Sequence, residues 1–185
     1  MNFTFDPETH IYKLDDREIP SVTQIIKEVF GEREWWSVHS AEVGRALHLA
    51  VHYYNTGSLD KSSLDDQIIG RFAGFEKFKI EAPYIIKQSE VVLFSSKYRF
   101  AGTLDMVMEN NIIADVKSSL DRAVYLQLGG YSILLNHAKK AFAVVLSKKG
   151  TYKLSDIIKG TKIKYWENAF LNCLSVYNLM KRHKI

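Results

Sequence analysis

The spacing of hydrophobic residues changes along the chain and divides it into a helical part and a strand-rich part. Apolar positions recur every three or four residues between residues 21 and 82, and every second residue between 90 and 119. The first spacing is typical of amphipathic helices and the second of strands with one buried face. The expected helices are residues 21–30, 40–55 and 64–82, and the expected strands are 90–96, 98–109 and 111–119.

The two ends of the chain add a hairpin and a second helical part. Alternating residues on either side of Asp6 and Pro7, which favour turns, predict a β-hairpin within residues 1–20. After the strands, the pattern predicts a helix over 122–137, strands over 141–147 and 151–154, and a closing helix over 161–184. This order favours an α/β (α+β) fold with a mixed central sheet flanked by helices. A chain of 185 residues suits a single domain.

Three charged residues stand in strands that otherwise look buried: Asp105, Asp115 and Lys117. A buried charge costs several kcal/mol unless it is paired or bound to a metal. Alternate residues of a strand share a face, so Asp115 and Lys117 point the same way. If apolar residues face each other across the hairpin, Met106 pairs with Ala114 and Asp105 comes to lie opposite Asp115.

This pairing depends on the length of the turn. A two-residue turn at Asn110 and Asn111 would place the aspartates on opposite faces, so we expect a three-residue loop, 109–111, or a bulge. The same strands also predict that Leu104 shares a face with Met106 and Met108. In the simpler alternative, Lys117 only neutralises an exposed carboxylate pair on a solvated face of the sheet.

Two carboxylates this close form a hard, oxygen-rich site that suits Mg²⁺ or Mn²⁺. The single cysteine, Cys173, excludes a thiolate cluster, so oxygen and imidazole must hold any metal. Such an ion stabilises charge on phosphorus, which predicts phosphodiester hydrolysis. The net charge of +4 is compatible with a polyanionic partner such as DNA. We find neither an apolar run long enough for a membrane helix nor the layout of a signal peptide, and expect no membrane contact.

Five motifs in order carry a resemblance to a known family: residues 44–48 (GRALH), Glu90, residues 102–105 (GTLD), residues 115–117 (DVK), and Gln127 with Tyr131. The chain resembles the PD-(D/E)XK nuclease superfamily, and within it the RecB-like exonuclease branch and related phage and mitochondrial genome-maintenance nucleases. The resemblance covers residues 40–146 and implies a restriction-endonuclease-like catalytic core there. Leu104 replaces the proline of the superfamily name, as is common in this branch, and the iron–sulphur subgroup is excluded.

The resemblance also implies a role for each motif. His48, Asp105 and Asp115 would ligate the metal together with the backbone carbonyl of Val116, and Lys117 would be the catalytic lysine. Glu90 would hold a water or a second ion. Gln127 would orient the lysine or the attacked phosphate, and Tyr131 would touch DNA.

Further candidates for substrate binding come from residue chemistry. Trp35 and Trp36 could stack on unpaired bases, and Arg45, Lys148 and Lys149 could contact phosphates. We expect His52 to be structural or peripheral.

The sequence thus predicts an Mg²⁺- or Mn²⁺-dependent DNA exonuclease acting at DNA ends or on single strands. Two alternatives remain: a DNA-binding module of the same fold without turnover, and a restriction-type endonuclease. We expect the protein to remain in the cytoplasm of a bacterial or phage-infected cell; the mitochondrial matrix is the alternative compartment.

Overall fold

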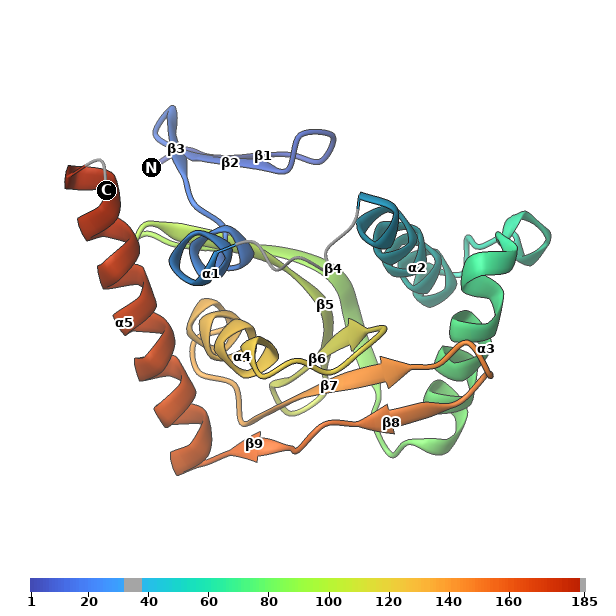
Figure 1. Cartoon of the computed structure of the whole chain (residues 1–185). Helices are drawn as coiled ribbons and strands as arrows, with labels where there is room; N and C mark the ends of the chain where they lie inside the picture. Colours follow the sequence, from blue (N-terminus) through green and yellow to red (C-terminus); the bar gives the residue numbers. More distant parts are fainter. Residues whose placement is uncertain (32–37, 184–185) are drawn as a thin grey trace.

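The central sheet of the molecule is mixed, with one parallel pair among antiparallel ones. The computed structural model describes residues 1–31 and 38–183, the side chains of 38–41 excepted. Six strands form the sheet, in the order β4-β5-β6-β7-β8, with β9 also paired to β7 (Figure 1). Their bounds are β4 Ile86–Ser95, β5 Phe100–Met108, β6 Ile112–Lys117, β7 Lys140–Leu146, β8 Tyr152–Leu154 and β9 Ile158–Lys159. Only β6 and β7 run parallel within this sheet, and α4 (Ala123–Leu134) connects them.

Helices cover both faces of the sheet. On one face lie α1 (Val22–Phe30), α4 and α5 (Thr161–His183), and on the other lie α2 (Val38–Thr56) and α3 (Asp66–Glu81), with the short 3₁₀ helix Lys61–Ser63 between them (Figure 1). Each face has its own hydrophobic cluster, one around Phe100, Leu128 and Phe170, the other around Phe72, Phe75 and Phe142. The expected fold, a mixed sheet flanked by helices, is confirmed.

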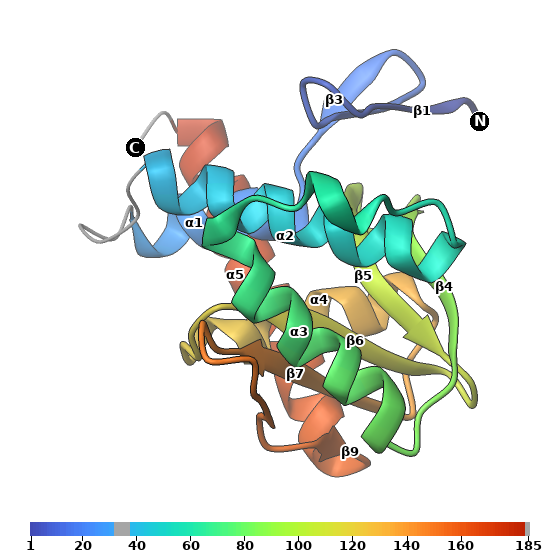
Figure 2. The same cartoon turned by 90° about the vertical axis from the view of Figure 1, so that its right-hand side faces the viewer.

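The N-terminal segment forms three strands where the sequence predicted a two-stranded hairpin. The antiparallel strands are β1 Phe3–Asp6, β2 Ile11–Leu14 and β3 Arg17–Ile19. Asp15 and Asp16 both have positive φ, which suits a tight turn between β2 and β3. The third strand escaped prediction because it is three residues long and mostly charged. This small sheet stands above the rest of the molecule in Figure 2 and packs through Tyr12, Leu14 and Ile19 onto Ala101 of β5.

Close packing of helices explains the paired glycines of α4. A Cβ placed on Gly129 would lie 2.3 Å from the Trp166 carbonyl oxygen of α5, and one on Gly130 would meet Val22 of α1 at 2.9 Å. Both glycines therefore face neighbouring helices, and not the sheet.

Replacing Gly129 by alanine is expected to lower the free energy of unfolding by about 1–3 kcal/mol, because the added methyl group meets backbone that cannot move aside. This loss is net of the gain of about 1 kcal/mol that alanine brings in helix propensity. Gly44→Ala on α2 is the matched control, since its Cβ meets no described atom within 4 Å. Urea unfolding of the two variants measures the difference, and equal stabilities would contradict the packing argument.

Candidate active site

The hairpin of β5 and β6 has the predicted register. Met106 pairs with Ala114 and Met108 with Ile112, so the connecting loop has three residues, 109–111. Asn110 and Asn111 both adopt positive φ, a conformation that asparagine tolerates better than most side chains. The two-residue turn that would have separated the aspartates is therefore absent.

Beyond Met106 and Ala114 the backbone pairing stops, and a side chain takes its place. Asp105 Oδ2 accepts a hydrogen bond of 2.6 Å from the amide nitrogen of Val116. This bond ties the aspartate of β5 to the segment of β6 that carries Asp115 and Lys117. The carboxylate thus sits where the two strands diverge, at the end of their ladder.

One predicted feature of β5 is wrong. Leu104 packs in the cluster of α1, α4 and α5, whereas Met106 and Met108 pack in the cluster of α2 and α3. Strict alternation fails next to Asp105, where the neighbouring strand β4 is also distorted. On β4, the residue before Glu90 pairs with Met106 and the residue after it pairs with Leu104. Glu90 itself has a φ of +53°. A non-glycine residue in this conformation inside a strand is strained, and such strain clusters at functional sites.

Three side chains from three elements meet at this point. Ligand atoms of His48 on α2, Glu90 on β4 and Asp105 on β5 all lie within 4.8 Å of one another. His48 Nδ1 is 3.1 Å from Asp105 Oδ1. The sequence placed Glu90 at the start of its strand, but β4 begins at Ile86, which puts Glu90 in the middle of the strand and beside Asp105.

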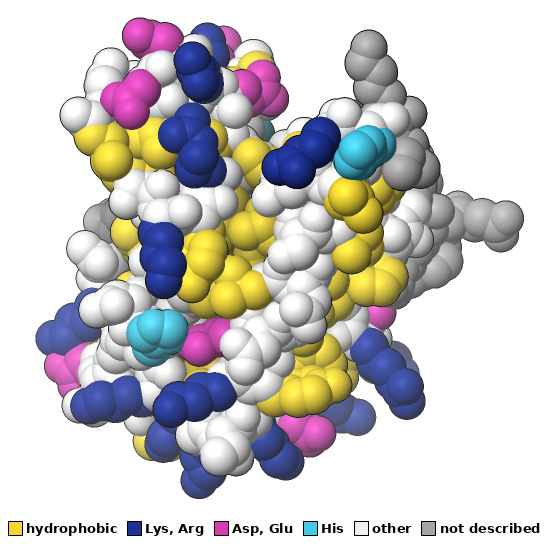
Figure 3. Space-filling view, turned by 90° about the vertical axis from the view of Figure 1, so that its left-hand side faces the viewer, with side chains coloured by type: hydrophobic (Ala, Val, Ile, Leu, Met, Phe, Trp, Pro, Cys, Tyr) yellow, Lys and Arg dark blue, Asp and Glu magenta, His cyan; other side chains and the backbone are white. Residues whose placement is uncertain are grey.

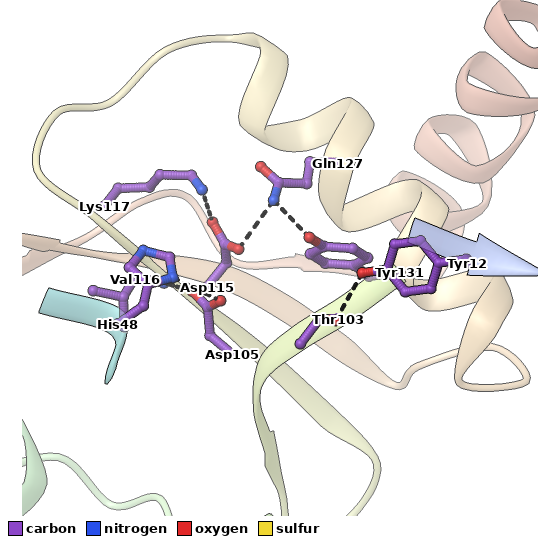
Figure 4. Close-up of polar contacts among 9 residues, drawn as sticks. All are labelled: Tyr12, His48, Thr103, Asp105, Asp115, Val116, Lys117, Gln127 and Tyr131. Atoms are coloured by element: carbon purple, nitrogen blue, oxygen red, sulfur yellow. Dashed lines mark hydrogen bonds and ion pairs between the residues drawn. The ribbon is translucent and has the colours of Figure 1, made fainter. Parts of the chain in front are cut away.

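A second polar chain runs from Lys117 to α4 (Figure 4). Lys117 Nζ lies 2.6 Å from Asp115 Oδ2, so the two side chains share a face of β6. Gln127 Nε2 donates to Asp115 Oδ1 at 3.2 Å and to the Tyr131 hydroxyl at 2.9 Å. Asp115 is fully buried, which means that Lys117 and Gln127 hold a carboxylate that water does not reach.

The electrostatics of the site reflect an excess of carboxylates. Burial raises the pKa of Glu90 to about 7, and the charge of Asp105 adds to the increase. Burial also raises the pKa of Asp115 to about 6, although the Lys117 ammonium opposes the shift. Burial disfavours the charged form of His48, but the Asp105 carboxylate outweighs it and raises the pKa of His48 to about 9.

These residues fit a divalent cation. Lys117 balances one of the three carboxylates, those of Glu90, Asp105 and Asp115, and a divalent ion with a neutral His48 would balance the other two. Asp115 Oδ2 receives no hydrogen bond of regular geometry from the described residues, although Lys117 is close. Carboxylate oxygens are the ligands that Mg²⁺ and Mn²⁺ prefer.

Magnesium is expected to raise the melting temperature more at pH 9 than at pH 6. Without metal, Glu90, Asp115 and His48 keep protons up to pH values of about 7, 6 and 9, above their ordinary pKa values. The stability they contribute is present at low pH and is lost as the pH rises through these values. A metal must displace those protons, so it binds more tightly as the pH increases. Thermal unfolding with and without Mg²⁺ measures this, and a shift independent of pH would contradict it.

Three residues predicted to bind phosphates, and the predicted ligand Val116, lie on or beside the elements around this centre. Arg45 is exposed on α2, one turn before His48, and the side chain of Val116 packs in the cluster of α2 and α3. Lys148 and Lys149 are exposed just after β7. They lie toward the same end of the sheet as Lys117, because Lys117 pairs with Val145.

Three further predictions have different outcomes. The tryptophans Trp35 and Trp36 lie outside the described residues. Tyr131 is only 5% exposed and its hydroxyl holds Gln127, so the structure gives no support to a direct contact with DNA. His52 donates to or accepts from Ser89 Oγ at 2.8 Å and thereby links α2 to β4.

One contact near the site was not predicted from the sequence. The Tyr12 hydroxyl of β2 forms a hydrogen bond of 2.8 Å with Thr103 Oγ1, two residues before Asp105 (Figure 4). The N-terminal sheet therefore forms part of the surroundings of the site. No local pattern connects residues 12 and 103, and only an aromatic residue in a short strand marks the first of them.

Comparison with known proteins identifies the fold. No family model and no curated protein matches the chain. Among solved structures, it is similar to a candidate exonuclease from Eubacterium rectale, with a TM-score of 0.51 and 15% identity, over 89% of this chain and 73% of that one. An alkaline exonuclease from Laribacter hongkongensis matches with a TM-score of 0.44 and 11% identity, over 86% and 90% of the two chains. At these identities the Eubacterium match shows the fold alone.

Proposed function

We propose that this chain is a metal-dependent deoxyribonuclease that hydrolyses phosphodiester bonds as an exonuclease, at DNA ends or on single strands. The observation that carries the proposal is the meeting of His48, Glu90 and Asp105 within 4.8 Å, where β5 and β6 diverge. The pair of Asp115 and Lys117 lies on the adjoining segment of β6. A strained backbone at Glu90 and two raised carboxyl pKa values mark the same place.

The order of motifs supports assignment to the RecB-like branch of the PD-(D/E)XK superfamily. The motif residues His48, Glu90, Asp105, Asp115, Lys117 and Gln127 all belong to the two polar groups described above. The likeness of the fold to a candidate exonuclease agrees with this assignment.

The residues of the chain divide the chemistry among them. A bound Mg²⁺ supplies a water of lowered pKa and stabilises charge on the phosphorus centre; His48, Glu90, Asp105 and Asp115 would hold it. Burial opposes the charge of Lys117, but Asp115 and Asp105 keep its pKa above the ordinary value. The lysine therefore remains an ammonium and is suited to neutralise charge that develops on the phosphate. Gln127 would act as a positioning residue, because its side-chain amide donates a hydrogen bond to Asp115.

The surface around α5 gives no separate indication of a DNA track. On the face in Figure 3, hydrophobic side chains run through the middle, and Lys and Arg side chains are scattered around them. Tyr165, Val176 and Leu179 of α5 are among the exposed hydrophobic residues. Lys and Arg side chains thus do not form one continuous stripe on this face.

A nuclease assay tests the proposal. The purified protein is incubated with oligonucleotides labelled at the 5′ or 3′ end, single-stranded and duplex, with Mg²⁺ or Mn²⁺ or with EDTA. We expect shortening of the labelled strands only when the metal is present. Binding without degradation would favour the DNA-binding module. In a parallel digest of closed circular DNA, cutting of the circles would favour the endonuclease.

A further inference from the structure

A groove runs along the outer edge of the sheet and ends at the candidate metal site. It has a volume of about 600 Å³ and is lined by Asn55 and Thr56 at the end of α2, Lys79 near the end of α3, and residues 84–91 of β4 and its approach. We call it the β4 groove. Glu90, one of its lining residues, also belongs to the cluster with His48 and Asp105. From Glu90 to Ile86, β4 extends for about 13 Å along the groove.

The groove holds a lysine whose charge is not balanced. Lys79 Nζ donates to Asn55 Oδ1 at 3.1 Å and lies over the Tyr54 ring, and no carboxylate partner is found for it in the described part of the chain. Burial lowers the pKa of Lys79. In contrast, the pKa values of Lys61 and Lys181, each hydrogen-bonded to a glutamate, are raised. Lys79 is exposed and has no carboxylate partner among the described residues, so it is available to bind an anion.

A second donor beside Lys79 also lacks an acceptor. Asn55 uses its Oδ1 atom for Lys79, and its Nδ2 atom is buried without a hydrogen-bond partner among the described residues. A buried amide donor without an acceptor costs about 1–3 kcal/mol. The exposed Lys79 ammonium is the kind of group that contacts phosphate oxygens in proteins that bind nucleic acids, and Asn55, which accepts from it through Oδ1, positions it.

The groove does not favour a peptide strand as its occupant. The edge of β4 carries Lys87 and Gln88, and charged or polar residues on an edge strand discourage the addition of another strand. Lys87 is already paired with Glu109 at 2.7 Å, so Lys79 is the lysine of the groove that remains available.

We propose that the β4 groove binds the sugar-phosphate backbone of the DNA strand next to the bond that is cleaved, with Lys79 and Asn55 as a phosphate site. This inference rests on the proposed nuclease function. The strand enters the metal site past Glu90, and its contacts in the groove are independent of base sequence. The hydrogen bond between His52 and Ser89 holds α2 against β4, between the metal site and the rest of the groove.

Binding of a fluorescein-labelled single-stranded oligonucleotide in EDTA, followed by fluorescence anisotropy, tests the phosphate site apart from catalysis. Lys79→Gln is expected to weaken binding about fivefold at 0.1 M salt, and to reduce the slope of log K against log salt by about 0.7, the effect of one lost phosphate contact. Asn55→Asp, which places a carboxylate in the phosphate site, should weaken binding at least as much. Lys77→Gln is the control, because Lys77 lies on the same helix but pairs with Glu81 outside the β4 groove.

The outcomes separate the subsite from the nuclease function. If the wild-type protein degrades DNA and both groove variants bind it like Lys77→Gln, the subsite is wrong and the function stands. If the wild-type protein neither binds nor degrades DNA, both proposals fail. Circular dichroism melting of each variant shows whether a loss of binding reflects unfolding, and Lys79→Arg, which keeps the charge, should restore binding.

Discussion

Replacing Lys117 by alanine is expected to lower the rate of Mg²⁺-dependent DNA hydrolysis by about 10²–10³-fold, the usual effect of removing one group that stabilises charge in the transition state. Lys117 is the cation beside Asp115, and its raised pKa keeps it charged at neutral pH. DNA binding should weaken by no more than about fivefold, the contribution of a single phosphate contact. Single-turnover kinetics on an end-labelled strand measure the rate, and anisotropy in EDTA measures binding.

Two controls show what a loss of activity means. Without Lys117, the buried Asp115 loses its counter-charge, and its pKa, already about 6, should rise further so that it takes up a proton. Because the protonated Asp115 carries no charge, the Lys117→Ala variant should still fold, and thermal unfolding checks this. Lys164→Ala, an exposed lysine near the start of α5, should keep full activity. A Lys117→Ala enzyme with wild-type turnover would exclude the lysine from the chemistry.

Replacing Asp105 by asparagine is expected to abolish the stabilisation that Mg²⁺ gives and to reduce hydrolysis by more than about 10²-fold. Asp105 touches both halves of the site: it pairs with His48 and accepts the hydrogen bond from the Val116 amide. Its charge is also what raises the pKa of His48 above that of an ordinary imidazole. Even a change next to a metal ligand commonly costs 10–100-fold in metal affinity, and loss of a charged ligand should cost more.

Two readouts keep this prediction independent of activity. The first is the Mg²⁺-dependent increase in melting temperature, which should vanish in Asp105→Asn. The second is the pKa of His48 by NMR, which should fall toward 6.5 because its carboxylate partner is gone. An Asp105→Asn protein that still gains stability from Mg²⁺ would show that the ion binds elsewhere.

The strand register and the pairing of Asp115 with Lys117 could be predicted because alternation fixes them locally. Met106, Met108 and Ala114 have only one arrangement that keeps apolar residues together, and the loop length follows from it. Leu104 escaped this reasoning because the strand is distorted beside Glu90, and no periodicity in the sequence signals a positive φ.

Other features depend on contacts that local patterns do not contain. The spacing of Gln127 and Tyr131 shows that they share a face of a helix, but not that the face is turned into the core. Tyr12 and Thr103 are 91 positions apart, and the fold alone brings them together. No periodic pattern connects α2 with β4, so local spacing could not predict that His48 and Glu90 approach Asp105. Only the resemblance of the motifs implied this approach.

The proposed function requires that residues from α2, β4, β5 and β6 hold a divalent ion beside Lys117. Anomalous diffraction from crystals grown with Mn²⁺ tests it most directly. We expect an anomalous peak within coordination distance of Asp105 and of at least one of His48 and Glu90. A protein that binds Mn²⁺ only at other sites, with Asp105 still paired to His48, would contradict the account.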